Sequence, residues 1–230
     1  MKEHNYIIHY WIDFAKTFTK GLIMGRKTDK RTRLIDAAST LIHRQGFNLT
    51  TLAHIAELAT VPLGNVYYYF KTKDAIGEAV IESYFSKIRH HVAEWDALSN
   101  PRDRLIAFVK RELQQADVTA RYGCQVGALC QELAKQDGQL AQSAANLLHY
   151  LLDWCEKQFT ELGLNKAKAH EAALQVIASF EGFALLSCAF RDTSMINKFA
   201  AIVDNLLEKS DASSASSRTR HATKSEESTH

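Results

Sequence analysis

The residues best suited to chemistry lie between Thr50 and Lys73, where hydroxyl, amide, phenol and ammonium groups follow one another. A glycine such as Gly64 lets a backbone approach a phosphate closely, and the amide of Asn65 can pair with a base edge. Tyrosine hydroxyls bond to phosphates, and lysines supply positive charge beside them. This combination favours contact with duplex DNA. The candidate residues are Thr50, Thr51, Pro62, Leu63, Gly64, Asn65, Tyr67, Tyr68, Tyr69, Lys71 and Lys73.

Two short helices about a tight turn are predicted to position these groups. Thr51 can cap a helix over 52–58, in which apolar residues recur on one face only. Pro62 breaks that run and favours a second helix over 63–70, because proline is tolerated at the first helical position. One face of the second helix docks and the other stays free. This is the arrangement of a helix-turn-helix that enters a major groove.

A longer helix over 28–45 precedes the pair and stops at Gly46. Basic residues crowd its start, although a helix dipole prefers acids there. A nearby phosphate would explain them, and a solvated charged face explains each one equally well. Residues 26–74 carry eight Lys and Arg against four Asp and Glu, whereas 75–210 carry fourteen against seventeen. The basic surplus therefore lies where the helix-turn-helix lies, as phosphate binding requires.

The stretch from Thr28 to Val80 resembles the DNA-binding domain of the tetracycline-repressor (TetR) family of bacterial regulators. Two departures occur: Thr60 stands where the family usually has a turn glycine, and Tyr69 where histidine is common. The first predicts a slightly different turn, and the second exchanges one phosphate-bonding group for another. The matching residues are Ala37-Ala38, Gly46-Phe47, Thr50-Thr51, Ile55-Ala56 and the run GNVYYYFKTKDAI from Gly64 to Ile76.

The resemblance implies an all-α fold of about nine helices, with an N-terminal three-helix helix-turn-helix domain and a C-terminal helical domain for ligand binding and dimerisation. We expect a fourth helix capped by Thr72 and ending near Leu98, and a fifth that begins at Pro101. Further helices are expected to about 135, over 138–162, from 165 to 192, and over 194–209. The predicted divisions are an extension over 1–25 that lies upstream of a start at Met24, domains over 26–73 and 74–210, and a disordered polar tail over 211–230.

Composition agrees with a helical, globular, cytoplasmic protein. Only 10 glycines and 2 prolines leave little material for turns, and no apolar run of the first 25 residues is long enough to span a bilayer. The four cysteines lack CxxC spacing, so reduced thiols are expected. His90 and Glu94 are spaced as a possible metal pair, but an exposed charged face explains them better. We expect no enzyme activity, cofactor, metal or membrane, and keep a helical enzyme or redox-active thiol protein as the alternative.

The last two helices are apolar over more of their circumference than one core needs. In the TetR family these helices form a four-helix dimer interface, so the resemblance implies a homodimer. The expected interface residues are Phe180, Phe183, Met195, Phe199, Ile202, Val203 and Leu206.

A small, mostly apolar effector is expected in the C-terminal domain, where Trp95, Phe108, Tyr122 and Trp154 could line a cavity or simply form core. Cys124 is a candidate sensor, because a helix N-terminus and Arg121 would favour its thiolate, and its surroundings resemble family members that respond to electrophiles or oxidants. A buried, inert thiol is the alternative. The implied function is a ligand- or electrophile-responsive repressor on a near-palindromic operator, or an activator of the same fold.

Overall fold

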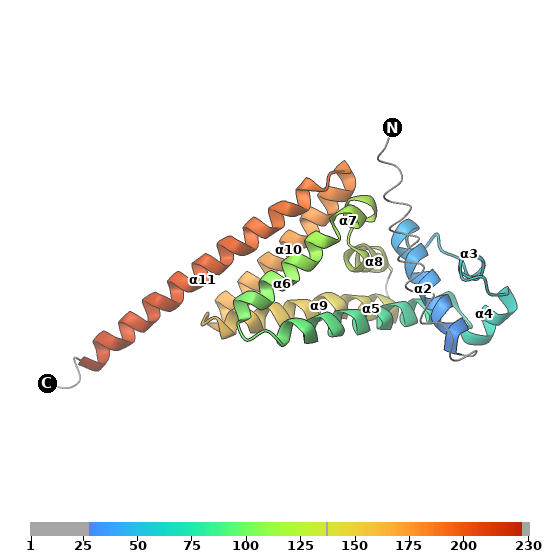
Figure 1. Cartoon of the computed structure of the whole chain (residues 1–230). Coiled ribbons are helices and arrows are strands. Elements are labelled where there is room, and N and C mark those ends of the chain that lie inside the picture. Colours follow the sequence, from blue (N-terminus) through green and yellow to red (C-terminus); the bar gives the residue numbers. More distant parts are fainter. Residues whose placement is uncertain (1–27, 137, 227–230) are drawn as a thin grey trace.

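The computed structural model describes residues 28–136 and 138–226 (Figure 1). Within these residues every regular element is a helix, from α2 to α11, so the all-α prediction is confirmed. The expected extension over 1–25, with its start at Met24, lies outside the described residues.

Three helices make the N-terminal domain: α2 (Thr28–Gln45), α3 (Leu52–Leu58) and α4 (Leu63–Tyr69). Their bounds agree with the sequence prediction, except that α4 ends one residue earlier than expected. Leu34, Ile55 and Val66 meet in the centre with no exposed surface. One apolar residue from each helix therefore fixes how the three helices lie together.

Helix α5 (Lys73–Asp96) leads out of this domain into the rest of the chain. It is capped as predicted, since the Thr72 hydroxyl accepts the Ala75 backbone N–H at 3.1 Å. Figure 1 shows α5 and α9 (Gln139–Glu161) side by side along one edge of an elongated molecule. Helices α6 (Pro101–Gln114), α10 (Lys166–Phe190) and α11 (Ser194–Glu226) form the opposite side.

Two elements differ from the prediction. The expected fifth helix is two helices, α6 and α7 (Ala116–Tyr122), with a break at Gln115 (φ −97°, ψ 8°). The break contains neither glycine nor proline, so no residue of the kind that usually ends a helix marks it. The tail over 211–230, which was expected to be disordered, is helical in part, because α11 continues to Glu226. Extending an existing helix fixes only one residue per added hydrogen bond, so polar composition does not by itself stop it.

Two apolar cores hold the fold together. The first joins α2, α3 and α4 to α5, α9 and the short helix α8 (Gln125–Leu133). The second joins the end of α5 to α6, α9, α10 and α11. The first core crosses from one domain into the other, so α5 is not the only element that ties the DNA-binding helices to the rest of the chain.

Candidate functional site

The outer face of α4 is open to solvent. Tyr68 is 71% exposed, and Tyr67 and Leu63 are exposed beside it. A side chain added at Gly64 would meet nothing within 4 Å. Val66 and Phe70 are buried on the other face and hold the helix in place. The structure thus brings together the exposed residues Pro62, Leu63, Gly64, Tyr67 and Tyr68, with Asn65 and Tyr69 half-buried at the margin.

Two predicted DNA contacts are engaged within the chain instead. Thr50 is buried, and its hydroxyl donates to the Gly46 carbonyl at 2.8 Å. The ammonium of Lys73 donates to the Asn48 carbonyl at 2.9 Å and lies over the Phe47 ring. We therefore remove Thr50 from the candidate DNA contacts and assign Lys73 first to the α2–α3 turn. Thr51 and Lys71 remain exposed.

Thr60 takes the backbone conformation that glycine normally supplies. Its φ is 53°, in the left-handed region, which is rare for a β-branched residue. Arg33 donates to the carbonyls of Ala59 and Thr60, and the Val61 N–H reaches the Ala56 carbonyl at 2.9 Å. The expectation that this turn differs slightly from that of the family stays a prediction. These bonds impose the left-handed turn on a threonine.

Helix α8 is clamped to the DNA-binding domain at both ends. Near its C-terminus, the Glu132 carboxylate accepts the backbone N–H groups of Phe47 at 2.6 Å and Asn48 at 2.7 Å. Just before its N-terminus, Nε2 of His43 donates to the Gly123 carbonyl at 2.9 Å. A movement of α8 would therefore displace α2 and the turn that follows it, because these hydrogen bonds join them directly.

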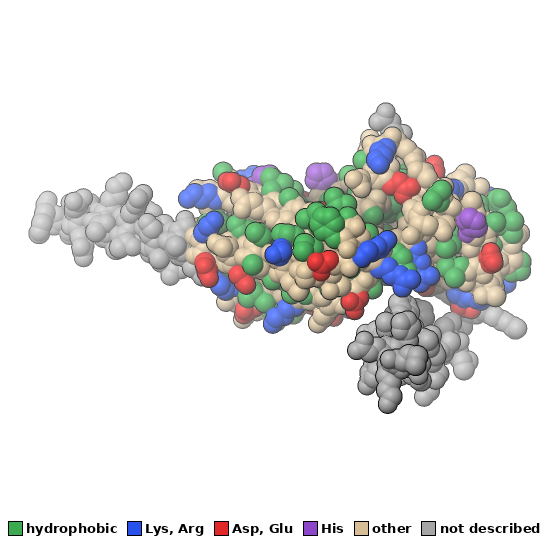
Figure 2. Space-filling view, turned by 90° about the horizontal axis from the view of Figure 1, so that it is seen from above, with side chains coloured by type: hydrophobic (Ala, Val, Ile, Leu, Met, Phe, Trp, Pro, Cys, Tyr) green, Lys and Arg blue, Asp and Glu red, His purple; other side chains and the backbone are tan. Residues whose placement is uncertain are grey.

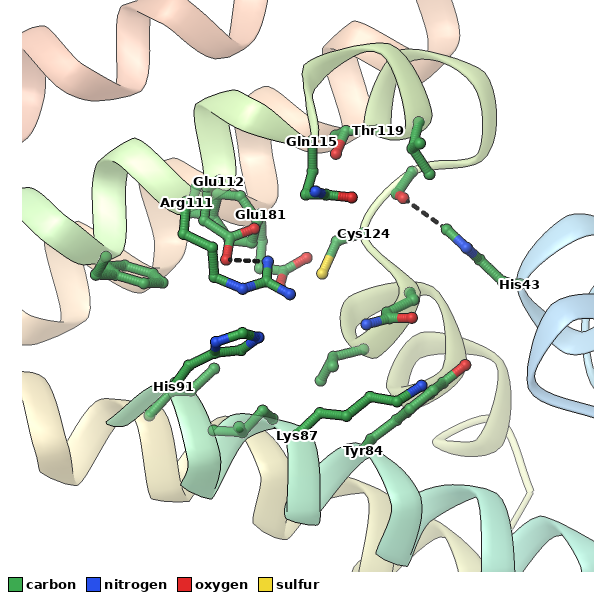
Figure 3. Close-up of a pocket in the computed structure, with 18 of the residues that line it drawn as sticks. His43, Tyr84, Lys87, His91, Arg111, Glu112, Gln115, Thr119, Cys124 and Glu181 are labelled. Carbon is green, nitrogen blue, oxygen red and sulfur yellow. Dashed lines mark hydrogen bonds and ion pairs between the residues drawn. The ribbon is translucent and has the colours of Figure 1, made fainter. Parts of the chain in front are cut away.

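A cavity of about 140 Å³ lies at the N-terminal end of α8 (Figure 3). Polar side chains from several helices converge on it, and Arg111 pairs with Glu112 at 3.1 Å in its wall. Trp95, Phe108 and Phe180 supply apolar surface. The labelled polar residues are His43, Tyr84, Lys87, His91, Arg111, Glu112, Gln115, Thr119, Cys124 and Glu181.

Electrostatics at the Cys124 end of this cavity oppose a thiolate. Burial raises the pKa of the Cys124 thiol well above its usual range, and the neighbouring Glu181 carboxylate raises that pKa further. The Gly127 N–H donates to Cys124 Sγ at 3.4 Å, which is too little to offset these effects. Arg121 instead lies over the Tyr122 ring at 5.2 Å. The prediction of an activated thiolate at Cys124 is therefore wrong.

The predicted aromatic residues divide between cavity and core. Trp95 and Phe108 line the cavity as expected. Trp154 packs behind them, with its ring 5.1 Å from that of Trp95, and its Nε1 donates to Asp96 at 2.9 Å. Tyr122 borders a neighbouring groove. Sequence reasoning missed Glu112 and Glu181, because single acids on long helices look like solvated surface until the packing is known.

The groove has a volume of about 1000 Å³ and is bordered by α8, α9 and α10. Its wall is largely apolar, with alanines and leucines such as Leu148, Leu152 and Leu185. Figure 2 shows further hydrophobic side chains exposed among charged ones on the face seen from above Figure 1. Large apolar residues exposed on α10 and α11 are Leu174, Leu185, Leu186, Phe190 and Ile202.

Most residues predicted for a dimer interface are core residues of a single chain. Phe199 and Val203 are almost fully buried, and Phe180 and Leu206 are buried in the same cluster. Phe183 and Met195 are half-buried, and only Ile202 is exposed. Both helices are apolar on more than one face, and most of the predicted residues lie on the inner face. An interface must use the exposed residues instead.

Two other sequence features have ordinary surroundings. Both His90 and His91 contact Glu94 on the surface, and no group of three or more possible metal ligands occurs within the described residues. Helix α10 has the length and apolar composition of a membrane span, but it packs between α9 and α11. Core helices of water-soluble proteins share that composition.

Comparison with known proteins matches both halves of the chain. The model of bacterial regulatory proteins of the tetR family matches residues 34–80, and that of the LmrA/YxaF-like regulator C-terminal domain matches residues 102–202. The HTH-type transcriptional regulator LmrA of Bacillus subtilis is 25% identical over 184 residues, covering 79% of this chain and 98% of LmrA.

Two further matches are also transcriptional regulators. The HTH-type transcriptional repressor NemR of Escherichia coli is 30% identical over 89 residues, which is 38% of this chain and 45% of NemR. The crystal structure of a TetR transcriptional regulator from Legionella pneumophila has a TM-score of 0.73 at 18% identity. It covers 80% of this chain and 98% of that one.

Proposed function

Because the chain belongs to the TetR family of transcriptional regulators, which are not enzymes, we propose that it is a repressor that binds a near-palindromic operator as a homodimer and releases it when a small effector binds. One observation carries this proposal: α8 lines the effector cavity at one end and is bonded to the DNA-binding domain at the other. The relative NemR is itself named a repressor.

The DNA-binding domain of this proposal comprises residues 28–73, with α4 as the helix that enters the major groove. Gly64 and Asn65 lie in the first turn of α4, which is the part of a recognition helix that reaches base edges. Tyr67, Tyr68 and Lys71 are exposed beside them and supply phosphate contacts. Asn65 is therefore assigned to base reading, and the surrounding hydroxyl and ammonium groups to the backbone.

The homodimer of this proposal forms through exposed apolar residues of α10 and α11. Leu185 is 60% exposed and Phe190 is 64% exposed, and such a surface is costly to leave in water. A two-fold dimer places two copies of α4 on successive major grooves, with half-site centres about 34 Å apart. The second domain of the proposal, residues 74–210, thus supplies both the interface and the effector cavity.

The effector acts through its preference for one arrangement of the two domains. A ligand shifts an equilibrium only by its differential affinity for the two states. A ligand in the cavity touches residues beside the start of α8, so it can displace this helix, and Glu132 then carries the displacement to Phe47. Because Cys124 is not activated, a noncovalent effector fits the cavity better than an electrophile.

The experiment is selection of binding sites from random duplex DNA, followed by titration of the selected site. We expect a near-palindrome with half-sites about one helical turn apart, and light scattering that gives a dimer. Tyr68→Ala should weaken binding, and Tyr150→Ala, in a half-buried tyrosine far along α9, serves as the control. A monomer that binds all sequences equally would overturn the proposal.

A further inference from the structure

The Glu181 carboxyl lies in the wall that the cavity and the groove share. It lines both spaces from α10, and Figure 3 shows it beside Cys124 and Glu112. The facing residue on α8 is Gly127, where a Cβ would lie only 1.9 Å from Glu181 Oε2. Any larger residue there would push the carboxyl away. The glycine therefore makes room for an acid at this position.

Within the part of the chain that the structure describes, no cationic side chain pairs directly with Glu181. Among the described residues, no Lys, Arg or His nitrogen forms an ion pair with it within 4.0 Å, and Arg111 pairs with Glu112 instead. The Cys124 thiol donates a hydrogen bond to Glu181, and the charge of Glu112 opposes ionisation of Glu181. Glu181 is thus left without a direct ion-pair partner among the described residues, although the Lys87 and Arg111 side chains line the same cavity.

The rest of the cavity is suited to an apolar body of defined size. Trp95, Phe108 and Phe180 line it, and the rings of Phe108 and Phe180 lie 6.1 Å apart. A cavity of roughly 150 Å³ in another protein holds benzene, so about 140 Å³ admits a ligand of similar bulk. Larger ligands would have to extend past Glu181 into the groove.

We propose that the cavity binds a small organic amine as its cation, with the ammonium group donating to Glu181 and the apolar body packed against Trp95 and Phe108. This inference rests on the proposed function, since it names the chemical class of the effector. Charge-assisted hydrogen bonds in a site withdrawn from water are stronger than neutral ones. The ammonium therefore supplies the direct ion-pair partner that Glu181 lacks among the described residues.

Because protons compete with the amine for the Glu181 carboxylate, amine affinity should depend on pH. Burial raises the pKa of Glu181 to about 7, so below that pH a cation must displace a proton from the carboxyl. Amine affinity should fall by up to about tenfold for each pH unit below 7. Other titratable groups face the cavity, and the comparison must subtract their effects: His43, Tyr84, Lys87, His91, Arg111, Glu112 and Cys124. On the groove side the titratable groups are Tyr122, Cys130, His149 and Cys188.

The test is calorimetric titration of the full chain at pH 8 with benzylamine, benzyl alcohol and benzoate. These probes share one ring and carry a positive, a neutral and a negative group. We expect benzylamine to bind at least about tenfold more tightly than benzyl alcohol, and benzoate not to bind. Glu181→Gln keeps the side-chain shape and should abolish both the preference and its fall below pH 7. Glu171→Gln, an exposed acid on the same helix, should change neither.

Thermal unfolding of each variant confirms that the fold is kept. Equal affinity for the amine and the alcohol, a preference that survives in Glu181→Gln, or no binding of any probe would overturn the inference. Operator binding is measured on the same samples without probe. If the protein binds its operator but shows no amine preference, the inference fails while the proposed function stands.

Discussion

The Glu132 carboxylate accepts the Phe47 backbone N–H at 2.6 Å, joining a helix of the C-terminal domain to the turn that leads into the helix-turn-helix. The same carboxylate fills the space next to Gly46, where a Cβ would lie 2.9 Å from Oε2. Gly46 has a φ of 86°, which favours glycine independently. The turn is thus shaped both by its own backbone and by an acid from α8.

Replacing Glu132 should loosen this joint. We expect Glu132→Ala to lower the free energy of unfolding by about 1–3 kcal/mol, because two backbone N–H groups lose a charged acceptor. It should also reduce the effect of effector on operator affinity. Urea unfolding and anisotropy titration with and without effector check this. Glu82→Ala is the control, since among the described residues Glu82 pairs with the surface residue Arg89. Unchanged coupling in Glu132→Ala would show that the signal passes through other contacts between the domains, such as α5 or the His43–Gly123 hydrogen bond.

The left-handed Thr60 stores strain that glycine would relieve. A β-branched residue at positive φ costs roughly 1–2 kcal/mol, and glycine loses part of that gain through its greater unfolded-state freedom. Thr60→Gly should therefore stabilise the protein by about 0.5–1 kcal/mol, measured as a rise in the urea midpoint. Thr160→Gly, in the last turn of α9, should destabilise it instead, because the Thr160 hydroxyl donates to the Glu156 carbonyl and glycine weakens the helix. A loss of stability in Thr60→Gly would mean that the Thr60 conformation carries no strain.

Burial separates the dimer surface from the core. The double variant Leu185→Asp and Phe190→Asp should sediment as a folded monomer, because both residues are exposed on one chain. The single variant Phe199→Asp should lose several kcal/mol of stability or fail to fold, because it buries an unpaired charge. Sedimentation with circular dichroism distinguishes the two effects. A dimer that persists in the first variant would place the interface elsewhere.

Glu181 should make stability depend on pH. Its folded pKa of about 7 exceeds the ordinary carboxyl value of 4.5, so the folded state holds a proton that the unfolded state has released. Its contribution is complete below pH 4.5 and is lost as the pH rises through 7. The loss should be about 3 kcal/mol at most. The stability of Glu181→Gln should lack this fall, so the difference between the wild-type and variant stability curves should show it. Parallel curves would contradict the raised pKa of Glu181.

The DNA-binding helices could be predicted from sequence almost to the residue, because caps, Pro62 and the apolar spacing all agree locally. Which face of α10 and α11 points inward could not be predicted, since both faces are apolar. Only the packing of α10 against α9 and of α11 against α6 decides between the faces. The two acids of the cavity wall could not be predicted as site residues for a similar reason. Glu112 and Glu181 are far apart in sequence, and their meeting depends on how α6 and α10 lie together.

Helix α4 is proposed to read the base sequence of the operator. The most direct test is to compare the affinity of Asn65→Ala for specific DNA with its affinity for nonspecific DNA. Anisotropy titrations would use the selected operator and a scrambled duplex at two salt concentrations, with Lys71→Ala beside it. We predict that Asn65→Ala loses about 1–3 kcal/mol on the operator alone, whereas Lys71→Ala weakens both duplexes and flattens the salt dependence. Equal losses on both duplexes for Asn65→Ala would contradict the assignment of α4 as the reading helix.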